Sequence, residues 1–174
     1  VGGVVGSAAN NTGFTLTISN STNGNRIGTN GIDKVGGIIG TFSNSKNVIQ
    51  GATLLVNNVT NIGDIKSESS SIIGGIIGFF FNIKTITITN SSNHGRIDVD
   101  NQHGTDSVVG GLIGSFTDTM NVIIHPIITL ENDINSGIIH VNSSSTMSIG
   151  GIIGSIHDSF SATVNVINSF NKGK

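Results

Sequence analysis

Asp118 and Asp158 are the residues best placed to do chemistry, because they occupy the same position in two neighbouring copies of a repeated segment. Two carboxylates at close range repel each other, which raises the pKa of one of them or attracts a cation. The other copies have Asn10, Asn44 and Asn82 at this position, and Asn and Asp are typical of turns. We therefore expect a turn here, treat Asp118 and Asp158 as weak metal candidates, and predict no catalytic residue and no cofactor.

The remaining titratable residues form no pattern. The five His occupy unrelated places in the repeats, and no pair has the spacing of metal ligands on one strand face. A polysaccharide lyase or hydrolase needs a cluster of carboxylates, yet outside the column of Asp118 and Asp158 the ten acidic residues are scattered. We therefore do not expect an enzyme, and a carbohydrate-active enzyme is the least favoured function.

Asparagine carries the strongest pattern, a block N-x-x-N-x-G-x-I that recurs in every copy and is cut short by the end of the sequence in the last. The first Asn of the block is Asn20, Asn58, Asn90, Asn132 and Asn168, and the second is Asn23, Asn61, Asn93, Asn135 and Asn171. Identical amides on strands stacked about 4.8 Å apart can hydrogen-bond along the stack. We predict that both columns are ladders at a corner, in preference to a polar binding strip.

The Gly of this block is replaced by Asn25 in the first copy. Because Asn and Gly are the residues that enter the left-handed region most readily, the exchange favours a positive φ at this position.

Sequons for N-glycosylation occur five times, and three of them fall on the first corner Asn. The possible glycosylation sites are Asn10, Asn20, Asn58, Asn90 and Asn142. Glycans would line the corner if the protein is secreted by a eukaryote.

The elements that must position these residues repeat with the motif Gly-Gly-(aliphatic)₂-Gly. Its five copies begin at Gly2, Gly36, Gly74, Gly110 and Gly150, which are 34, 38, 36 and 40 residues apart. A repeat of this period is a unit that buries its apolar face by stacking on its neighbours. We predict one repeat array over 1–174, with repeats 1–34, 35–72, 73–108, 109–148 and a truncated 149–174.

Each copy is typical of strands and turns, with a strand at the Gly motif, an alternating strand before the Asn block and a short strand after it. The prediction is an all-β fold, a parallel β-solenoid of about five rungs with three short strands each. Parallel crossovers favour a right-handed β-helix. A division of each repeat into two coils of about 18 residues is the competing interpretation.

Two further columns test this stacking. Phe42, Phe80 and Phe116 share one position and should pack together inside, while Asp64 should lie between Arg26 and Arg96 on neighbouring rungs. The outer face of the alternating strand is rich in Thr, at Thr15, Thr17, Thr53, Thr85, Thr87, Thr129 and Thr163. Ice-binding solenoids display flat Thr arrays, but Leu55, Ile127 and Asn165 interrupt this one.

Composition narrows the function classes. With 8 Lys and Arg against 10 Asp and Glu, and without Tyr or Trp, the chain does not resemble a nucleic-acid-binding protein. The longest apolar run, Ile72 to Phe81, is too short for a membrane span, which takes about 20 residues. The absence of Cys leaves the redox compartment open. Since the chain opens inside a repeat without an initiator Met or a signal peptide, we expect a processed product or a part of a longer protein.

The repeat pattern resembles the GLUG family, which combines a Gly-Gly-Leu-Val-Gly-like strand with an Asn-rich Gly-x-Val/Ile corner. The resemblance covers essentially the whole chain, although the aromatic residue often found beside the corner Asn is missing here. It implies a β-helical stretch of a large surface or secreted bacterial protein, adhesins included.

We therefore expect a structural or adhesive segment of an extracellular or cell-surface protein that acts as a stiff spacer or filament unit. Its partners would be a second copy, through end-to-end or lateral assembly, or ligands of a cell surface or matrix. A ligand-binding solenoid for glycans or ice, on the Thr-rich face, is the alternative. A glycan site would be expected to show an aromatic platform of Tyr or Trp.

Overall fold

The structure is a computed structural model that describes residues 1–10, 13–31, 33–44, 51–69, 71–102, 106–117, 125–157 and 162–174. The described residues form strands and no helix, and all strand pairs are parallel. Five sheets run the length of the molecule, and the chain visits them in the order A, B, C, D, E before it begins the next rung. The parallel β-solenoid is thereby confirmed.

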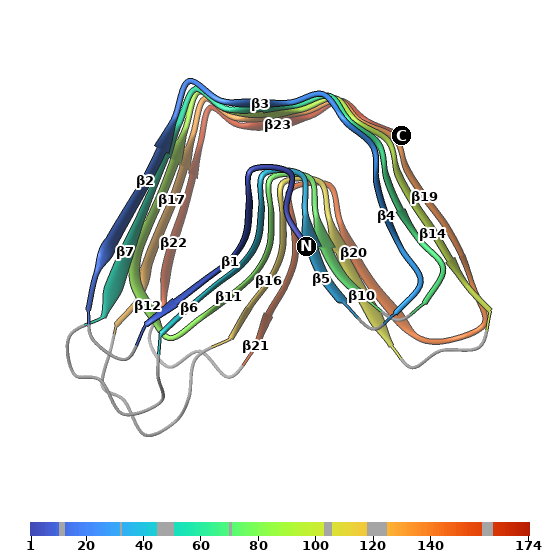
Figure 1. Ribbon diagram of the computed structural model, residues 1–174. Helices are drawn as coiled ribbons and strands as arrows, with labels where there is room; N and C mark the ends of the chain where they lie inside the picture. Colours follow the sequence, from blue (N-terminus) through green and yellow to red (C-terminus); the bar gives the residue numbers. More distant parts are fainter. Residues whose placement is uncertain are drawn as a thin grey trace.

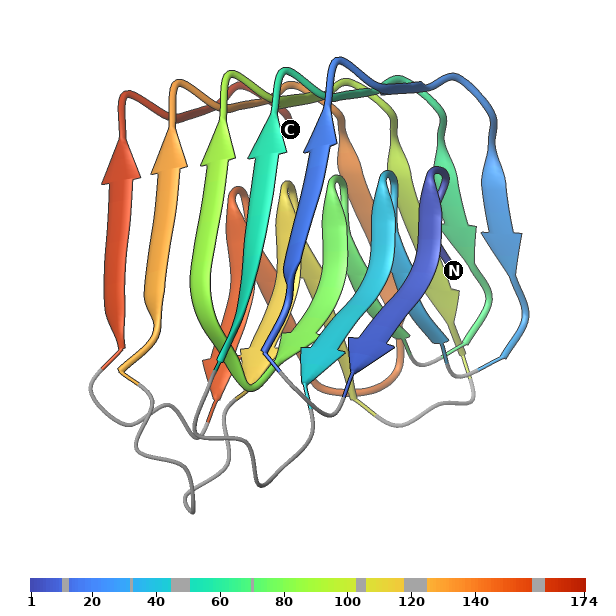
Figure 2. The ribbon, with the colours of Figure 1, turned by 60° about the vertical axis from the view of Figure 1, so that its left-hand side comes forward.

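Sheets A, B and C contain the longer strands. Sheet A contains β5 (Asp33–Gly36), β10 (Ser71–Gly74), β15 (Ser107–Gly110) and β20 (Met147–Gly150). Sheet B contains β1 (Val5–Asn10), β6 (Ile39–Asn44), β11 (Ile77–Phe81), β16 (Ile113–Thr117) and β21 (Ile153–His157). Sheet C contains β2 (Thr15–Ser19), β7 (Ala52–Asn57), β12 (Ile83–Thr89), β17 (Ile127–Glu131) and β22 (Thr163–Ile167). Figure 2 shows the strands of sheet C side by side, all pointing the same way.

Sheets D and E complete each rung. Sheet D contains the two-residue strands β3 (Thr22–Asn23), β8 (Thr60–Asn61), β13 (Ser92–Asn93), β18 (Ile134–Asn135) and β23 (Phe170–Asn171). Sheet E contains β4 (Ile27–Thr29), β9 (Ile65–Ser67), β14 (Ile97–Asn101) and β19 (Ile139–Ser143).

A rung has five strand segments, so the prediction of three strands was wrong in number. Two features explain the difference. The Gly-Gly motif is a bend that separates sheet A from sheet B, as between Gly36 and Ile39. The Asn block forms its own short strand in sheet D. Sequence alternation identified the segments as extended but could not locate the bend, because Gly suits both a strand interior and a turn.

Each repeat makes one rung, which excludes the division into two coils of about 18 residues. Val5 pairs with Ile39, Ile77 with Ile39 and Ile77 with Ile113, and each residue of these pairs has the same position in its repeat. The predicted register is therefore confirmed.

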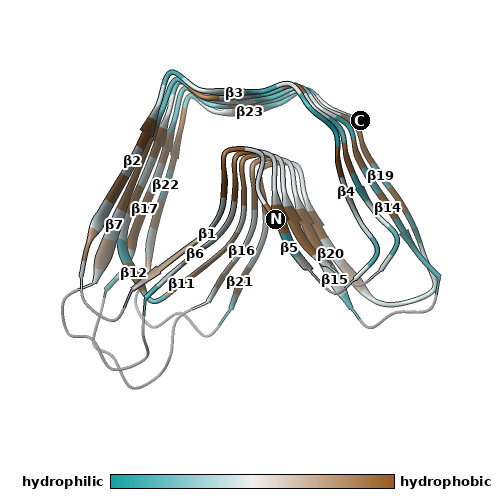
Figure 3. Cartoon of the chain, viewed as in Figure 1, coloured by the Kyte–Doolittle hydropathy of each residue, from teal (hydrophilic) through white to brown (hydrophobic). Residues whose placement is uncertain are grey.

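In cross-section the rung has two lobes (Figure 1). Sheets C, D and E form the outer path, whereas sheets A and B fold back inside it and meet at the Gly-Gly bend beneath sheet D. One apolar cluster lies between sheets B and C, and a smaller one lies between sheets A and E. The apolar residues follow the strands of these lobes, and the bends at the ends of sheet D are more hydrophilic (Figure 3).

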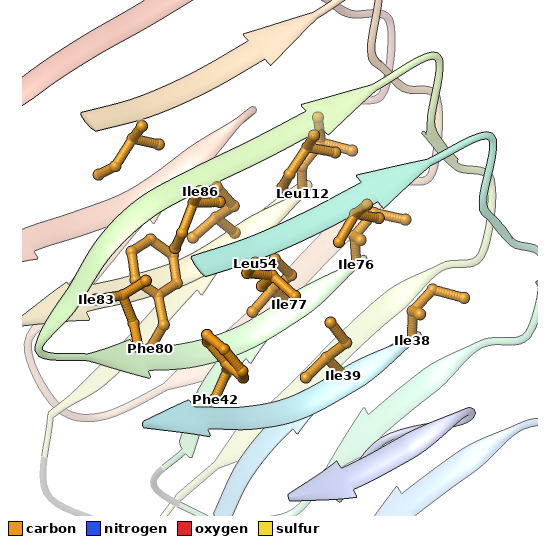
Figure 4. Close-up of a cluster of buried hydrophobic side chains, with 14 of the residues drawn as sticks. Ile38, Ile39, Phe42, Leu54, Ile76, Ile77, Phe80, Ile83, Ile86 and Leu112 are labelled. Carbon is orange, nitrogen blue, oxygen red and sulfur yellow. The ribbon is translucent and has the colours of Figure 1, made fainter. Parts of the chain in front are cut away.

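The predicted Phe column lies in the larger cluster (Figure 4). Phe42, Phe80 and Phe116 are in register and at most 1% exposed. The rings of Phe80 and Phe116 stack with centroids 4.9 Å apart. Phe14 of the first rung packs against Phe42 of the second, with ring centroids 5.1 Å apart. Ile38, Ile76 and Leu112 continue this core towards the Gly-Gly bends (Figure 4).

Candidate functional site

The second corner Asn of each block forms a continuous ladder, which is buried from Asn23 to Asn135 and ends at the exposed Asn171. The Nδ2 of Asn23 donates to Oδ1 of Asn61 at 2.8 Å, Asn61 to Asn93 at 2.7 Å, Asn93 to Asn135 at 2.9 Å and Asn135 to Asn171 at 2.7 Å. The same Nδ2 also donates to the backbone carbonyl two residues on, as from Asn61 to Gly63 at 2.9 Å. Both amide protons are thus used inside the protein, where an unpaired amide would be costly.

The Gly-Gly bend is what buries this ladder. A Cβ on Gly37 would lie well under 3.0 Å from the Asn61 side chain, and a Cβ on Gly75 would lie equally close to Asn93. The second Gly of the motif is therefore required because the bend presses directly on the amide of its own rung. The two motifs that dominate the sequence form one packed unit.

The first corner Asn has a different role from the one predicted. Asn20, Asn58, Asn90, Asn132 and Asn168 all have a positive φ, between 47° and 58°. The backbone N–H groups of the first four donate to the next rung, as from Asn58 to the Thr89 carbonyl at 3.0 Å. This residue makes the left-handed turn at the corner, a conformation in which Asn is favoured over other residues with a Cβ.

A continuous ladder in this first column was the wrong expectation. Asn58 donates to Asn20 at 2.7 Å and Asn132 to Asn90 at 3.5 Å, but the amide of Asn90 donates to Asn57 at 3.3 Å and not to Asn58. The column is exposed, so water and neighbouring polar groups compete for these amides.

The corner Gly does not have the positive φ that the exchange for Asn25 suggested. No described glycine has a positive φ, and Asn25 is not among the residues that do. Gly is required because a Cβ on Gly63 or Gly95 would lie well under 3.0 Å from the corner carbonyl of the preceding rung. The reason is close approach between rungs, which a single repeat of the sequence does not reveal.

The charged residues after the corner lie on the exposed side of sheet E. Asp64 is in register between Arg26 and Arg96, as the flanking pairs of Ile27 with Ile65 and Ile65 with Ile97 require. Its carboxylate accepts the backbone N–H of Arg96 at 2.8 Å, while the Arg96 guanidinium contacts Asp98 at 3.4 Å. The register is confirmed, but the charges pair along the strand.

Asp98 also accepts a hydrogen bond from His140 on the next rung, with 2.8 Å between Nδ1 and Oδ1. This bond, helped by Arg96, lowers the pKa of the Asp98 carboxyl below its usual value. His140 is exposed and Asp98 is half-buried, on the outer side of sheet E. A surface pair of this kind contributes little to stability.

One buried carboxylate, that of Asp133, was not predicted from the sequence. Asp133 follows the first corner Asn, is 0% exposed, and accepts the Ser91 N–H of the preceding rung through Oδ1 at 2.7 Å. Its Oδ2 has no hydrogen-bond partner within the described part of the chain. Burial raises the pKa of Asp133 to about 6. Ser91 and Ser169 occupy the equivalent place on other rungs. The Oγ of each accepts the backbone N–H of the equivalent residue on the preceding rung, from Val59 and from Asp133. Alignment of Asp133 with these two Ser is the signal that identifies it as an acceptor.

The predicted Thr residues lie together on the outer face of sheet C. Thr15, Thr53, Thr85, Ile127 and Thr163 form one column, and Thr17, Leu55, Thr87, Thr129 and Asn165 form the next. Leu55 is 37% and Ile127 46% exposed, so these two side chains make apolar breaks in an otherwise hydroxylated face.

The sequon residues Asn20, Asn58 and Asn90 lie exposed in one column on successive rungs. Asn142 is exposed on sheet E, where it donates to Asp100 at 3.2 Å. The side chain of Asn10 lies outside the described part of the chain.

The two weak metal candidates, Asp118 and Asp158, also lie outside the described residues. Within the described ranges, no group of three or more His, Cys, Asp or Glu side chains is arranged to hold a metal ion. The described residues also contain no helix that is long and apolar enough to cross a membrane.

Comparisons with known proteins were made at three levels. A scan against protein-family models found no matching family, and searches of curated proteins and of solved structures found no significant match. The resemblance to GLUG-type repeats stays a prediction.

Proposed function

We propose that this chain is a non-catalytic structural or adhesive segment of an extracellular or cell-surface protein. The observation that carries the proposal is the amide ladder from Asn23 to Asn171, which runs through all five rungs without a break and is buried in the first four. The residues that recur most strictly, Asn and Gly, are used to hold one rung to the next. This use of Asn and Gly favours a structural role, in which the segment must be rigid and regular.

The dimensions of the segment favour a role as a contact surface over a role as a long spacer. Five rungs at about 4.8 Å span about 19 Å from first to last, although each repeat uses more than 30 residues. A long spacer would need many more repeats.

The connections between sheets B and C support a role in contact. They range from one residue, at 82, to nine, at 118–126, whereas the connections from sheet E to sheet A have three residues, or five at 102–106. The connections between sheets B and C thus vary more in length than those from sheet E to sheet A. Variable segments on a rigid scaffold are where binding specificity usually resides.

The test measures whether the protein is exposed on intact cells and whether it binds a cell surface or extracellular matrix. Antibodies against residues 1–174 should label intact cells of the source organism, and the purified protein should bind saturably to a cell surface or to extracellular matrix. As a matched control, Asn93→Ala disrupts the ladder without changing any exposed side chain and should weaken binding in proportion to unfolding. Labelling that requires cell lysis would contradict the proposal.

A second candidate function is binding of ice or a glycan through the Thr face. The two in-register columns of sheet C support it, because most of their residues are Thr and their positions repeat from rung to rung. Thermal hysteresis of the purified protein tests the ice version. Thr87→Lys in the centre of the face should abolish it, whereas Thr117→Lys on sheet B should not.

A further inference from the structure

The corner Gly of each later rung is packed against the rung before it. A Cβ at Gly63, Gly95, Gly137 or Gly173 would lie well under 3.0 Å from a backbone carbonyl oxygen of the preceding corner. That oxygen belongs to Asn25 for Gly63, and to Gly63 for Gly95. Any side chain at this position is therefore excluded by the rung on its N-terminal side.

The first rung departs from this rule, because Asn25 carries a side chain at the same position. Asn25 is exposed, and the repeat geometry directs its Cβ towards the N-terminal side of the solenoid. A further rung stacked there in the same register would place its corner carbonyl where this Cβ lies.

The hydrogen bonds of the first corner also differ. In later rungs the corner N–H donates to the preceding rung, as from Gly63 to the Asn23 carbonyl at 3.2 Å and from Gly95 to the Asn61 carbonyl at 3.3 Å. The N–H of Asn25 instead donates to Oδ1 of Asn23, at 3.2 Å, within its own turn. That Oδ1 is the atom that would accept the ladder bond from a preceding Asn, so the donor and the acceptor of the open edge satisfy each other.

We propose that the N-terminal edge of the Asn corner is a stop for stacking. It does not accept another rung of this kind stacked in full register. The stop is local, since sheet B has Gly6 at the equivalent edge, and a glycine has no Cβ to oppose a further strand.

This stop has a consequence for self-assembly. Head-to-tail stacking would place the last corner of one copy, at Gly173, against Asn25 of the next copy. The Cβ of Asn25 forbids that contact in full register. End-to-end stacking of two copies in full register is therefore excluded.

The test adds a rung and asks whether it docks. Residues 73–108 are duplicated in front of Val1, where the junction Val108–Val1 reproduces the natural junction Val108–Val109. The extended protein is made with Asn25, with Asn25→Ala and with Asn25→Gly, each beside its unextended counterpart. Denaturant midpoints and amide exchange of β4 are measured for all six proteins.

The added rung should raise the midpoint and slow the exchange of β4 amides in the Asn25→Gly protein only. Asn25→Ala is the matched control, because it removes the amide but keeps the Cβ, and it should behave as wild type does. The proposal is overturned if all three extended proteins gain equally, or if the Asn25→Gly protein gains nothing.

Discussion

Asn61 and Asn93 are joined by a 2.7 Å hydrogen bond between their side-chain amides, and both residues are completely buried. They are 32 residues apart in sequence and directly adjacent along the solenoid. The Gly-Gly bends of their own rungs cover them. This contact links the two repeated motifs.

Asn93→Ala should destabilise the protein by about 2–4 kcal/mol, because it removes three hydrogen bonds and leaves two buried partners unsatisfied. Equilibrium unfolding in urea measures the loss. The matched control is Asn90→Gly, which changes the exposed Asn of the same corner and keeps its positive φ available. A loss no larger than that of the control would contradict the buried ladder.

Asn132→Val should cost about 1–2 kcal/mol more than Asn132→Gly, because φ is 58° at this residue and a β-branched side chain is strained there. The comparison isolates the backbone, since both variants lose the exposed amide. Equal stabilities in thermal unfolding would show that the amide, and not the left-handed conformation, explains the first Asn column.

Gly95→Ala should destabilise by about 3 kcal/mol or more, although Gly95 does not have a positive φ. The added methyl would press on the Gly63 carbonyl, and backbone atoms cannot move aside without breaking the rung contact. Asn25→Ala, at the equivalent place on the first rung, should be nearly neutral. If Gly95→Ala is tolerated as well as Asn25→Ala, close approach does not explain the corner Gly.

Asp133 should make the stability depend on pH. Its pKa is raised from 3.8 to about 6 on folding, so the folded protein holds the proton more tightly than the unfolded chain does. The stability that this proton supplies is present below about pH 4, is lost as the pH rises through 6, and stays absent above.

Asp133→Asn should therefore raise stability at pH 7, by at most about 3 kcal/mol, and should flatten the profile between pH 4 and pH 7. Oδ1 of the new amide can still accept the Ser91 N–H. Melting temperatures of both proteins across this pH range provide the measurement. An unchanged slope would mean that Asp133 is hydrated or paired in solution.

Much of the architecture could be predicted from the sequence, because equivalent positions of a stacked repeat lie next to each other on neighbouring rungs. The columns of Phe42 and Phe80 and of Asn61 and Asn93 follow from alignment of the repeats alone. The inward fold of sheets A and B did not follow, since the close contact of Gly37 with Asn61 depends on where the chain bends. The sequence likewise suggested a conformational role for the corner Gly, and only the neighbouring rung reveals the steric one.

The candidate site was harder to predict than the fold. The two Asn of each corner look equivalent in the sequence, yet one is a buried ladder residue and the other a left-handed turn residue. Their difference arises from burial under the Gly-Gly bend, which is a tertiary effect. Asp133 was overlooked because it breaks a column otherwise held by small residues, and its burial raises its pKa in a way that composition does not show.

The most direct test of the account is an NMR measurement of the side-chain amides of Asn61, Asn93 and Asn135. The account predicts slow hydrogen exchange for these Nδ2 protons and nuclear Overhauser contacts from each Asn to its counterpart one repeat away. Rapid exchange, or contacts between residues about 18 positions apart, would contradict the stacked single-coil repeat and the ladder that holds it together.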